Sequence, residues 1–289
     1  MTAQNVCAVI VTYNPRPTFV ESIVNVGAQV NHVVVVDNGS STETEQHLHT
    51  VERRLGCTLI HNRQNLGIAL ALNLGVKYAL ETGYDWVCTL DQDSQVCDGY
   101  ISEMLDAYQR APHPERVALL APSYVDRESG VKMRLKRACD GEILTAMTSG
   151  SMVPLAAIRK LGFFDESLYM DAVDIEFCLR ARREGMLILQ SPAVLLHSLG
   201  ATSYHRLFGL RFGVTNHAAN RRYYMTRNRL RLLMRYAADW PWTWRESRTM
   251  LLDAAKIVLV EDNKWRKFRA IAAGITDACR GKLGKQVEL

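Results

Sequence analysis

Two carboxylates separated by one residue, Asp91 and Asp93, are the side chains best suited to chemistry in this chain. They follow residues 86–90, a short apolar run typical of a buried strand. Carboxylates two positions apart at a strand end can point toward a common centre, and oxygen ligands suit a hard cation such as Mg²⁺ or Mn²⁺. Mg²⁺ is usually bound by one or two carboxylates together with substrate phosphates. A solvated acidic turn has the same sequence pattern, so the interpretation depends on what the fold places beside the pair.

The elements that position this pair are typical of an α/β domain with a mostly parallel sheet. Residues 6–11 and 33–36 are continuous, β-branched apolar runs bounded by turn formers, as strands buried on both faces are. Residues 17–30 have helical spacing between them, which predicts a β-α-β unit. The other elements expected before residue 200 are strands at 57–61, 117–121, 187–189 and 193–196, helices at 68–81, 99–110, 156–161 and 173–184, and a hairpin or loop at 126–141.

Polar segments follow four of the predicted strands. In open parallel sheets, ligands bind beyond the carboxyl ends of the strands, so these segments should meet at one edge. One acidic residue after a strand is common, whereas four polar segments in register indicate a shared site. The four segments are Thr12-Tyr13-Asn14, Asp37-Asn38-Gly39-Ser40, residues 62–67 and Asp91-Gln92-Asp93-Ser94.

Composition narrows the class of protein. The chain has 289 residues and is 48% hydrophobic, enough for one large domain or one domain with an appendage. The seven cysteines are scattered and form no C-x-x-C pair, so we expect neither a disulfide framework nor a structural zinc site. Neither a signal peptide nor a run of the roughly 18 apolar residues of a membrane-spanning helix is visible. We therefore expect a cytoplasmic protein, peripheral at the inner face of the cell membrane.

Charge divides the chain into two parts. Residues 204–289 hold 18 Lys and Arg against 7 Asp and Glu, whereas residues 1–203 hold 17 against 23. We therefore expect an α/β domain at 1–203 and a basic amphipathic helical extension at 204–289. Its expected helices span 220–236, 246–260 and 264–279, with 239–244 as a break.

Tryptophans interleaved with cations in this extension suit an anionic membrane surface. A solvated helical cap and a homodimer formed through the same helices are the alternatives. The residues that give the extension this composition, besides its many Lys and Arg, are Trp240, Trp242, Trp244, Trp265 and Phe268.

The chain resembles the family 2 glycosyltransferases, which have the GT-A fold. The resemblance covers roughly residues 6–200 in the family's order. Its motifs are Val9-Ile-Val-Thr-Tyr-Asn14, Val34-Val-Val-Asp-Asn-Gly-Ser40, Asn65-Leu-Gly-Ile-Ala-Leu-Ala-Leu-Asn-Leu-Gly75, Leu90-Asp-Gln-Asp93, and Gly162-Phe-Phe-Asp-Glu166 followed by Asp174-Ile-Glu-Phe-Cys-Leu-Arg180. Within the family, Leu90-Asp-Gln-Asp-Ser94 and residues 170–182 are most similar to bacterial rhamnosyltransferases, which use dTDP-L-rhamnose.

The resemblance implies an inverting, metal-dependent transfer of L-rhamnose from dTDP-L-rhamnose to a hydroxyl of a glycan or lipid-linked acceptor. Such enzymes make bacterial surface polysaccharide, such as O-antigen, or glycolipid. The implied cofactor is Mg²⁺ or Mn²⁺, and the implied partners are a nucleotide-sugar donor and the acceptor. By position, the resemblance implies donor binding by Thr12, Tyr13, Asn14, Asp37, Asn65, Gly67, Asp91 and Gln92, a sugar or acceptor region at Ser149, Gly150, Ser151 and Asp171, and metal ligation by Asp91, Asp93 and His197.

Asp174 is the candidate catalytic base. The family's usual Glu-Asp pair at this place reads Val173-Asp174, so only the second position is kept, and Asp171 could supply the missing carboxylate. An inverting transfer needs one base to remove the acceptor proton and positive charge on the departing diphosphate. The resemblance, thinner in the basic tail, also suggests that Arg227-Asn228 reaches the diphosphate.

Three other functions compete with this interpretation. A UDP-sugar donor is the first alternative, because only the family likeness distinguishes it from dTDP-rhamnose. A dinucleotide-dependent oxidoreductase would need Gly-x-Gly-x-x-Gly after the first strand, where Thr12-Tyr-Asn-Pro-Arg-Pro17 stands instead. A noncatalytic nucleic-acid-binding protein would leave Asp91, Asp93 and Asp174 unexplained, so no nucleic-acid partner is expected.

Overall fold

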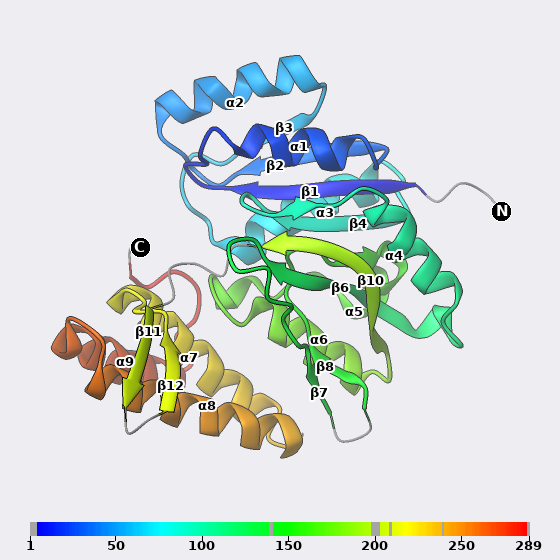
Figure 1. Ribbon diagram of the computed structural model, residues 1–289. Helices are drawn as coiled ribbons and strands as arrows, with labels where there is room; N and C mark the ends of the chain where they lie inside the picture. Colours follow the sequence, from blue (N-terminus) through cyan, green and yellow to red (C-terminus); the bar gives the residue numbers. More distant parts are fainter. Residues whose placement is uncertain (1–4, 139–140, 198–202, 208–209, 239, 288–289) are drawn as a thin grey trace. The chain divides into compact units, whose positions relative to one another are not determined.

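A computed structural model describes residues 5–138, 141–197, 203–207, 210–238 and 240–287 (Figure 1). The chain divides into two compact units. The first unit comprises residues 1–166 and 173–198, and the second comprises residues 167–172 and 199–289.

An eight-stranded sheet forms the centre of the first unit, with strand order β3-β2-β1-β4-β9-β6-β10-β5. The pairs β1–β2, β1–β4, β2–β3 and β6–β10 are parallel, whereas β9 and β5 run antiparallel to their neighbours. This arrangement confirms the mostly parallel sheet. The strands are β1 (Val6–Thr12), β2 (His32–Asp37), β3 (Thr58–His61), β4 (Trp86–Asp91), β5 (Gln95–Val96), β6 (Val117–Asp126), β9 (Met152–Pro154) and β10 (Leu187–His197).

Both faces of β1 are buried, which explains its unbroken apolar sequence. Ile10 and its alternate neighbours belong to one hydrophobic cluster with residues of α1, α2 and α4. Val9 faces the opposite side against α3, where a Cβ added to Gly75 would lie 2.2 Å from Val9 Cγ1. Only a glycine therefore allows α3 to approach β1 this closely. The helices of this unit are α1 (Phe19–Gly27), α2 (Thr42–Leu55), α3 (Ile68–Glu81), α4 (Tyr100–Gln109), α5 (Leu155–Leu161) and α6 (Val173–Arg183).

Helix α2 has no counterpart in the sequence prediction. Only Leu48 and Val51 of its fourteen residues are buried, so the apolar period that reveals a helix is too weak. It is stabilised at its ends instead: the Ser41 hydroxyl accepts from Thr44 N, and Gly56 is left-handed after the last turn.

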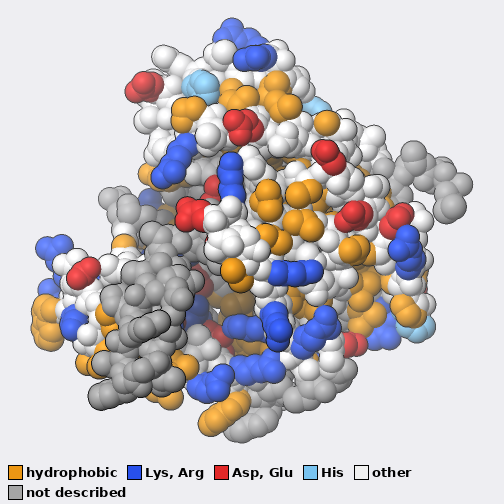
Figure 2. All heavy atoms as spheres, viewed as in Figure 1, with side chains coloured by type: hydrophobic (Ala, Val, Ile, Leu, Met, Phe, Trp, Pro, Cys, Tyr) orange, Lys and Arg blue, Asp and Glu red, His pale blue; other side chains and the backbone are white. Residues whose placement is uncertain are grey.

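A cationic hairpin lies in segment 126–145, and it includes residues 126–141, where a hairpin or loop was expected. Strands β7 (Lys136–Arg137) and β8 (Ile143–Thr145) pair antiparallel there. Figure 2 shows Lys and Arg side chains gathered over this part of the first unit, although residues 1–203 are net acidic. The exposed cations of the hairpin are Arg127, Lys132, Arg134, Lys136 and Arg137.

Within the described residues of the second unit there are three helices and an antiparallel hairpin, β11 (Ser203–Leu207) with β12 (Leu210–Val214), that the sequence did not predict. The helices are α7 (Ala219–Arg235), α8 (Trp240–Leu259) and α9 (Lys264–Cys279). Residues 239–244 were expected to break the helical run. Helices α7 and α8 are separate, but the expected extent of the break is wrong, because α8 already begins at Trp240, with Pro241 in its first turn. Proline is tolerated there because the first N–H groups of a helix have no intrahelical partner. Among the described residues, no helix is long and apolar enough to cross a membrane.

Candidate active site

Asp91, Asp93 and His197 come together at one edge of the sheet. Each offers one ligand atom, and these atoms lie within 4.8 Å of one another. Strand β4 ends at Asp91, and the chain then turns so that β5 pairs with the end of β10, placing Gln95 opposite Leu196. This pairing carries Asp93 toward His197, the last residue of β10, at 4.0 Å from its Nδ1.

Two buried serines connect these three residues. The Asp91 backbone N–H donates to Ser149 Oγ at 3.1 Å, and Ser149 Oγ lies 2.6 Å from Ser94 Oγ. Ser94 Oγ is in turn 3.1 Å from His197 Nδ1. Such outer partners hold metal ligands in fixed orientations. Ser149, which the resemblance assigned to the sugar or acceptor region, therefore lies directly behind the Asp91–His197 cluster.

The cluster fits a divalent cation. Opposite ligands of Mg²⁺ are roughly 4.2 Å apart at metal–oxygen distances of about 2.1 Å, only slightly less than the observed spread. Asp93 is 54% exposed, so a small rotation of its side chain would close the difference. Two carboxylates and one imidazole also suit Mn²⁺.

A second constellation surrounds Asp37, the last residue of β2. Its carboxylate is fully buried and lies 3.3 Å from Thr12 Oγ1, 3.2 Å from the Ser40 backbone N and in contact with Ser40 Oγ. His61 Nδ1 lies 2.8 Å from the same carboxylate, and its Nε2 lies 3.2 Å from Glu45 Oε1. Burying a carboxylate without such hydrogen-bonding partners would be costly.

His61 was missed in the sequence because its place at this site depends on the register between β2 and β3. It ends the strand predicted at 57–61, and in the parallel register it lies directly opposite Asp37. Side chains at equal positions of neighbouring parallel strands share one face of the sheet. The register, once known, therefore adds His61 to the polar groups of this edge.

Hydrogen bonds of the Asn38 side chain join the loop after β2 to the loop that carries Asn65 and Gly67. The Asn38 amide donates to Asn65 Oδ1 at 3.1 Å and to Gly67 O at 3.3 Å, while its Oδ1 accepts from Leu66 N at 3.0 Å. The loops touch at Gly39, whose φ is +86° and whose added Cβ would lie 2.5 Å from the carbonyl carbon of Gln64.

Replacing Gly39 with alanine is expected to lower the free energy of unfolding by about 3 kcal/mol, from left-handed strain plus the backbone clash. Gly83→Ala is the matched control, because Gly83 has φ +81° but no atom within 4 Å of its added Cβ. The free energy of unfolding of Gly83→Ala should fall by only about 1 kcal/mol, the cost of the left-handed strain alone. Urea unfolding of both variants measures the difference. Equal losses would show that the two loops separate without cost.

The loop after β1 is joined to two neighbouring loops. Gln92 Oε1 accepts from the Tyr13 backbone N–H at 2.8 Å, which connects the loops after β4 and β1. Asn14 N donates to Ser40 Oγ at 2.7 Å, and Asn14 Oδ1 accepts from Ser41 N at 2.9 Å. Tyr13 itself is exposed. The four polar segments predicted to meet at one edge are thus linked by hydrogen bonds in the first unit.

The loop containing Gly150 lies between β4 and the buried phenol of Tyr100. Gly150 N donates to Thr89 O at 2.7 Å, and the Tyr100 hydroxyl donates to Gly150 O. Burial raises the pKa of Tyr100 well above its ordinary value, so this phenol stays protonated and remains a donor. Ser151 is also fully buried, and its hydroxyl donates to Met147 O at 2.6 Å.

Asp174 lies in the first turn of α6, where its Oδ1 accepts from Ile175 N at 2.8 Å. Its charge reaches Tyr124, whose hydroxyl donates to Met147 O at the start of the Gly150 loop. Burial is the main cause that raises the pKa of Tyr124, a hydrogen bond with Ser151 lowers it, and the negative charge of Asp174 raises it further. The Gly150 loop is therefore hydrogen-bonded to Tyr124 through Met147 O and to Asp91 through Ser149.

Two residues that the sequence assigned to the donor or acceptor site, Asp171 and Arg227, belong to the second unit. Asp171 lies in segment 167–172 with a left-handed φ of 62°. Arg227 is fully buried on α7, and its guanidinium donates to Leu168 O at 3.0 Å and to Gly284 O at 2.6 Å. These bonds, with that from Nε to Asn228 Oδ1, hold Arg227 within this unit, and the suggestion that Arg227-Asn228 reaches the diphosphate stays a prediction.

The sheet and the polar groups at its strand ends define an α/β transferase of the GT-A class. The model of the glycosyl transferase family 2 matches residues 7–155, and the chain belongs to this family. The protein is therefore a glycosyltransferase.

Relatives with known names agree with this assignment. The dTDP-rhamnosyl transferase RfbF of Shigella flexneri is 28% identical over 298 residues, which cover 97% of each chain. Residues 1–349 of Staphylococcus aureus TarS in complex with UDP-GlcNAc superpose with a TM-score of 0.60 at 14% identity, covering 95% of this chain and 81% of that one. The Pyrobaculum calidifontis mannosyltransferase PcManGT in complex with GDP-Man and Mn²⁺ gives 0.58 at 15% identity, covering 96% and 76%. At these identities the two structures support the fold alone.

Proposed function

We propose that the protein transfers L-rhamnose from dTDP-L-rhamnose, with inversion, to a hydroxyl of a glycan or lipid-linked acceptor in bacterial surface polysaccharide or glycolipid synthesis. The observation that carries this proposal is the meeting of the Asp91–Asp93–His197 cluster with the buried Asp37 constellation at one sheet edge. The likeness to a dTDP-rhamnosyl transferase over nearly the whole of both chains supports the choice of sugar.

Each constellation has a role in this reaction. Asp37 and Thr12 line the pocket of the base, with Tyr13 and Asn14 beside it, and Asn65 and Gly67 border the ribose and diphosphate. Asp91, Asp93 and His197 would hold Mg²⁺ or Mn²⁺, and Gln92 orients the neighbouring loop. When bound, the cation supplies positive charge for the departing diphosphate.

In this scheme Asp174 is the general base that removes the proton of the acceptor hydroxyl. The acceptor oxygen forms the bond to the anomeric carbon while its proton passes to the Asp174 carboxylate. The bond from that carbon to the diphosphate breaks, and its electron pair leaves with dTDP. Gly150, Ser151 and Asp171 border the sugar and acceptor.

A donor panel tests this proposal. The purified protein, Mn²⁺ and a mixed glycan and lipid-linked acceptor extract are supplied with dTDP-rhamnose, UDP-glucose, UDP-galactofuranose or GDP-mannose, and nucleoside diphosphate release is measured with and without EDTA. We expect release from dTDP-rhamnose that EDTA abolishes. Preference for a UDP-sugar would show that the donor is a UDP-sugar instead of dTDP-rhamnose. If none of the four nucleotide sugars is turned over, the proposed reaction is overturned.

The second unit supplies a membrane-binding surface in this proposal. The buried residues of α9 are Lys267, Gly274 and Ala278, and α9 approaches α7 closely at Gly274, where an added Cβ would lie 2.7 Å from Tyr223 O. Helix α9 also has an apolar stripe at helical spacing, formed by Trp265, Phe268, Ile271, Ala272 and Ile275. This stripe lies beside the packing face rather than on it, because Trp265 is 74% exposed and Ile275 is also exposed. Exposed Arg266 and Arg269 flank the stripe. Exposed aromatic and apolar side chains among cations are typical of an interfacial membrane helix.

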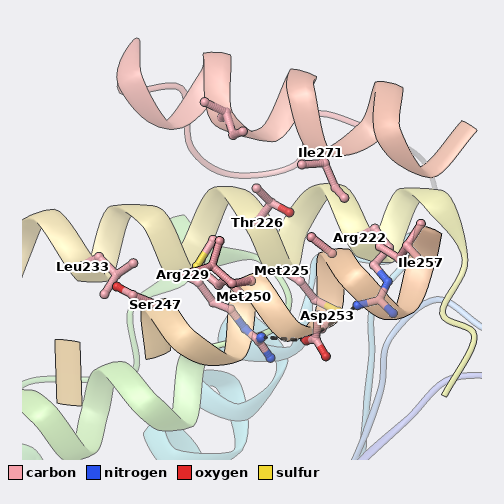
Figure 3. Close-up of a pocket in the computed structure, with 13 residues that line it drawn as sticks. Arg222, Met225, Thr226, Arg229, Leu233, Ser247, Met250, Asp253, Ile257 and Ile271 are labelled. Atoms are coloured by element: carbon pink, nitrogen blue, oxygen red, sulfur yellow. Dashed lines mark hydrogen bonds and ion pairs between the residues drawn. The ribbon is translucent and has the colours of Figure 1, made fainter. Parts of the chain in front are cut away.

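Helix α8 extends the same kind of surface. Leu251 is 73% exposed, and Trp244, Leu252, Val258 and Leu259 are exposed as well. A cavity of about 390 Å³ opens between α7, α8 and α9, and Figure 3 shows Ile271 of α9 above it and the Arg229–Asp253 ion pair, 3.4 Å long, below. Its apolar lining comes mainly from Met225, Leu233, Met250, Leu251, Ile257, Ile271 and Ile275.

Replacing Trp265 with serine is expected to weaken binding to vesicles of phosphatidylcholine and phosphatidylglycerol. Losing one inserted aromatic side chain removes about 2 kcal/mol, or roughly 30-fold in partitioning, without affecting the fold. Co-sedimentation with the vesicles measures this loss of binding, and high salt should weaken vesicle binding of the wild-type protein. Val131→Ser on the cationic hairpin is the control, because Val131 is also exposed.

Two outcomes contradict membrane binding by the second unit. If Val131→Ser weakened vesicle binding as much as Trp265→Ser, lipid binding would be assigned to the cationic hairpin. Unchanged vesicle binding in Trp265→Ser, with a change from dimer to monomer in light scattering, would instead make this face a homodimer interface.

A further inference from the structure

The segment 167–172 has an unusual backbone for residues other than glycine. Tyr169, Asp171 and Ala172 have φ of 62°, 62° and 63°. A left-handed residue with a Cβ costs roughly 1–2 kcal/mol, and such strain persists only where the surroundings hold it. Something in the second unit must therefore hold this segment.

Asn228 of α7 binds the segment directly. Its side chain is fully buried, and its amide nitrogen donates to the backbone oxygens of Leu168 at 2.8 Å, Met170 and Asp171 at 3.0 Å. An amide group has two hydrogens, so three converging carbonyls use its donor capacity completely. These carbonyls can converge on one nitrogen only because the left-handed residues fold the segment tightly around it.

Arg227 holds the same segment from the next position. Besides its bond to Leu168 O, its Nε donates to Asn228 Oδ1 at 2.9 Å, which orients the amide toward the carbonyls. The guanidinium carbon lies 5.0 Å from the centre of the Tyr224 ring, and Gly284 O accepts from the guanidinium on its other side. Backbone carbonyls and an aromatic face thus compensate a buried cation that would otherwise be costly.

The chain passes from Ala172 directly into Val173, the first residue of α6, and Asp174 follows. We propose that Arg227 and Asn228, the 227–228 clamp, are positioning residues for the transfer: they hold segment 167–172 so that Asp171 and Asp174 are presented to the acceptor. The proposal rests on the proposed role of Asp174 as the base.

Asn228→Asp tests the clamp with a nearly isosteric change. It replaces the donating nitrogen with an oxygen that repels the three carbonyls. We expect kcat to fall roughly 100-fold, the order expected for a displacement of about 1 Å at a reacting group. Donor KM and the Kd for dTDP should change little, because the donor-site residues belong to the first unit. A merely structural role would not separate kcat from donor binding in this way.

Lys267→Met is the matched control for stability. Lys267 is buried in the same unit, where its ammonium lies 2.7 Å from Glu261 Oε2 and donates to Asn216 Oδ1. It should destabilise the unit while leaving kcat near that of the unchanged protein. A loss of kcat in Lys267→Met as large as that in Asn228→Asp would overturn the clamp.

Rescue by glycine gives a second, independent outcome. Glycine adopts a φ near +60° without a Cβ penalty, so Ala172→Gly should let the segment keep its conformation with a weakened clamp. The double variant Ala172→Gly/Asn228→Asp should regain about tenfold in kcat over Asn228→Asp, the equivalent of the left-handed cost removed. An absence of rescue, or an unchanged kcat in Asn228→Asp, would contradict the proposal. If the unchanged protein transfers no sugar, the proposed function fails instead, so the two failures are distinct.

Discussion

Asp93→Ala is expected to abolish metal-dependent sugar transfer. Asp93 supplies one of only three ligand atoms that the described chain gathers at the end of β4, and it is the most exposed of them. The departing diphosphate carries negative charge that these residues do not neutralise by themselves. Losing the cation should therefore lower kcat by roughly 10³-fold or more, equivalent to about 4 kcal/mol of transition-state stabilisation.

Mn²⁺ binding measured by calorimetry, in parallel with nucleoside diphosphate release, separates this effect from misfolding. Asp98→Ala is the matched control, because Asp98 is an exposed carboxylate in the loop after β5 and lies outside the cluster. It should keep both Mn²⁺ binding and turnover. If Asp93→Ala retained both as well, the cation would have to be bound elsewhere.

The parts of the fold that position the donor site were predictable because their signals are local. Strands β1, β2 and β4 are apolar runs that end in polar residues, and a parallel sheet places such ends at one edge. Asp37 and Asp91 could therefore be assigned to one edge before any tertiary contact was known.

Residues joined by long-range pairing were not predictable in the same way. His61 joins Asp37 through the β2–β3 register, and Ser94 joins His197 because β5 folds back onto β10. Neither His61 nor Ser94 differs in type or spacing from ordinary polar residues near strand ends.

The C-terminal helices show how tertiary packing can differ from periodicity. The apolar spacing of α9 indicates an amphipathic helix, yet the buried residues of this helix are Lys267, Gly274 and Ala278. Lys267 is stabilised in this position by Glu261, and Gly274 allows close backbone approach. Periodicity locates an apolar face, but it does not show whether protein, lipid or solvent covers that face.

Asp174→Asn is expected to abolish transfer while donor binding survives. The asparagine has nearly the same shape, so α6 should begin as before, but an amide cannot take the acceptor proton. General-base catalysis typically contributes 10²–10⁴-fold, and we expect kcat to fall by roughly 10³-fold. The Kd for dTDP and the affinity for Mn²⁺ should stay near those of the unchanged protein, because their proposed ligands lie at the ends of β1, β2, β4 and β10.

Asp171→Asn, measured beside it, identifies the base. Asp171 is three residues earlier and is held through its backbone oxygen by Asn228, so its amide variant should keep the fold. If Asp174 is the base, Asp171→Asn keeps most of the activity and Asp174→Asn loses it. The reverse result would move the base to Asp171, and substantial activity in both variants would remove the base from this segment. Because Asn228 holds the backbone of Asp171, three residues before Asp174, the clamp variant should lose activity together with whichever aspartate proves essential.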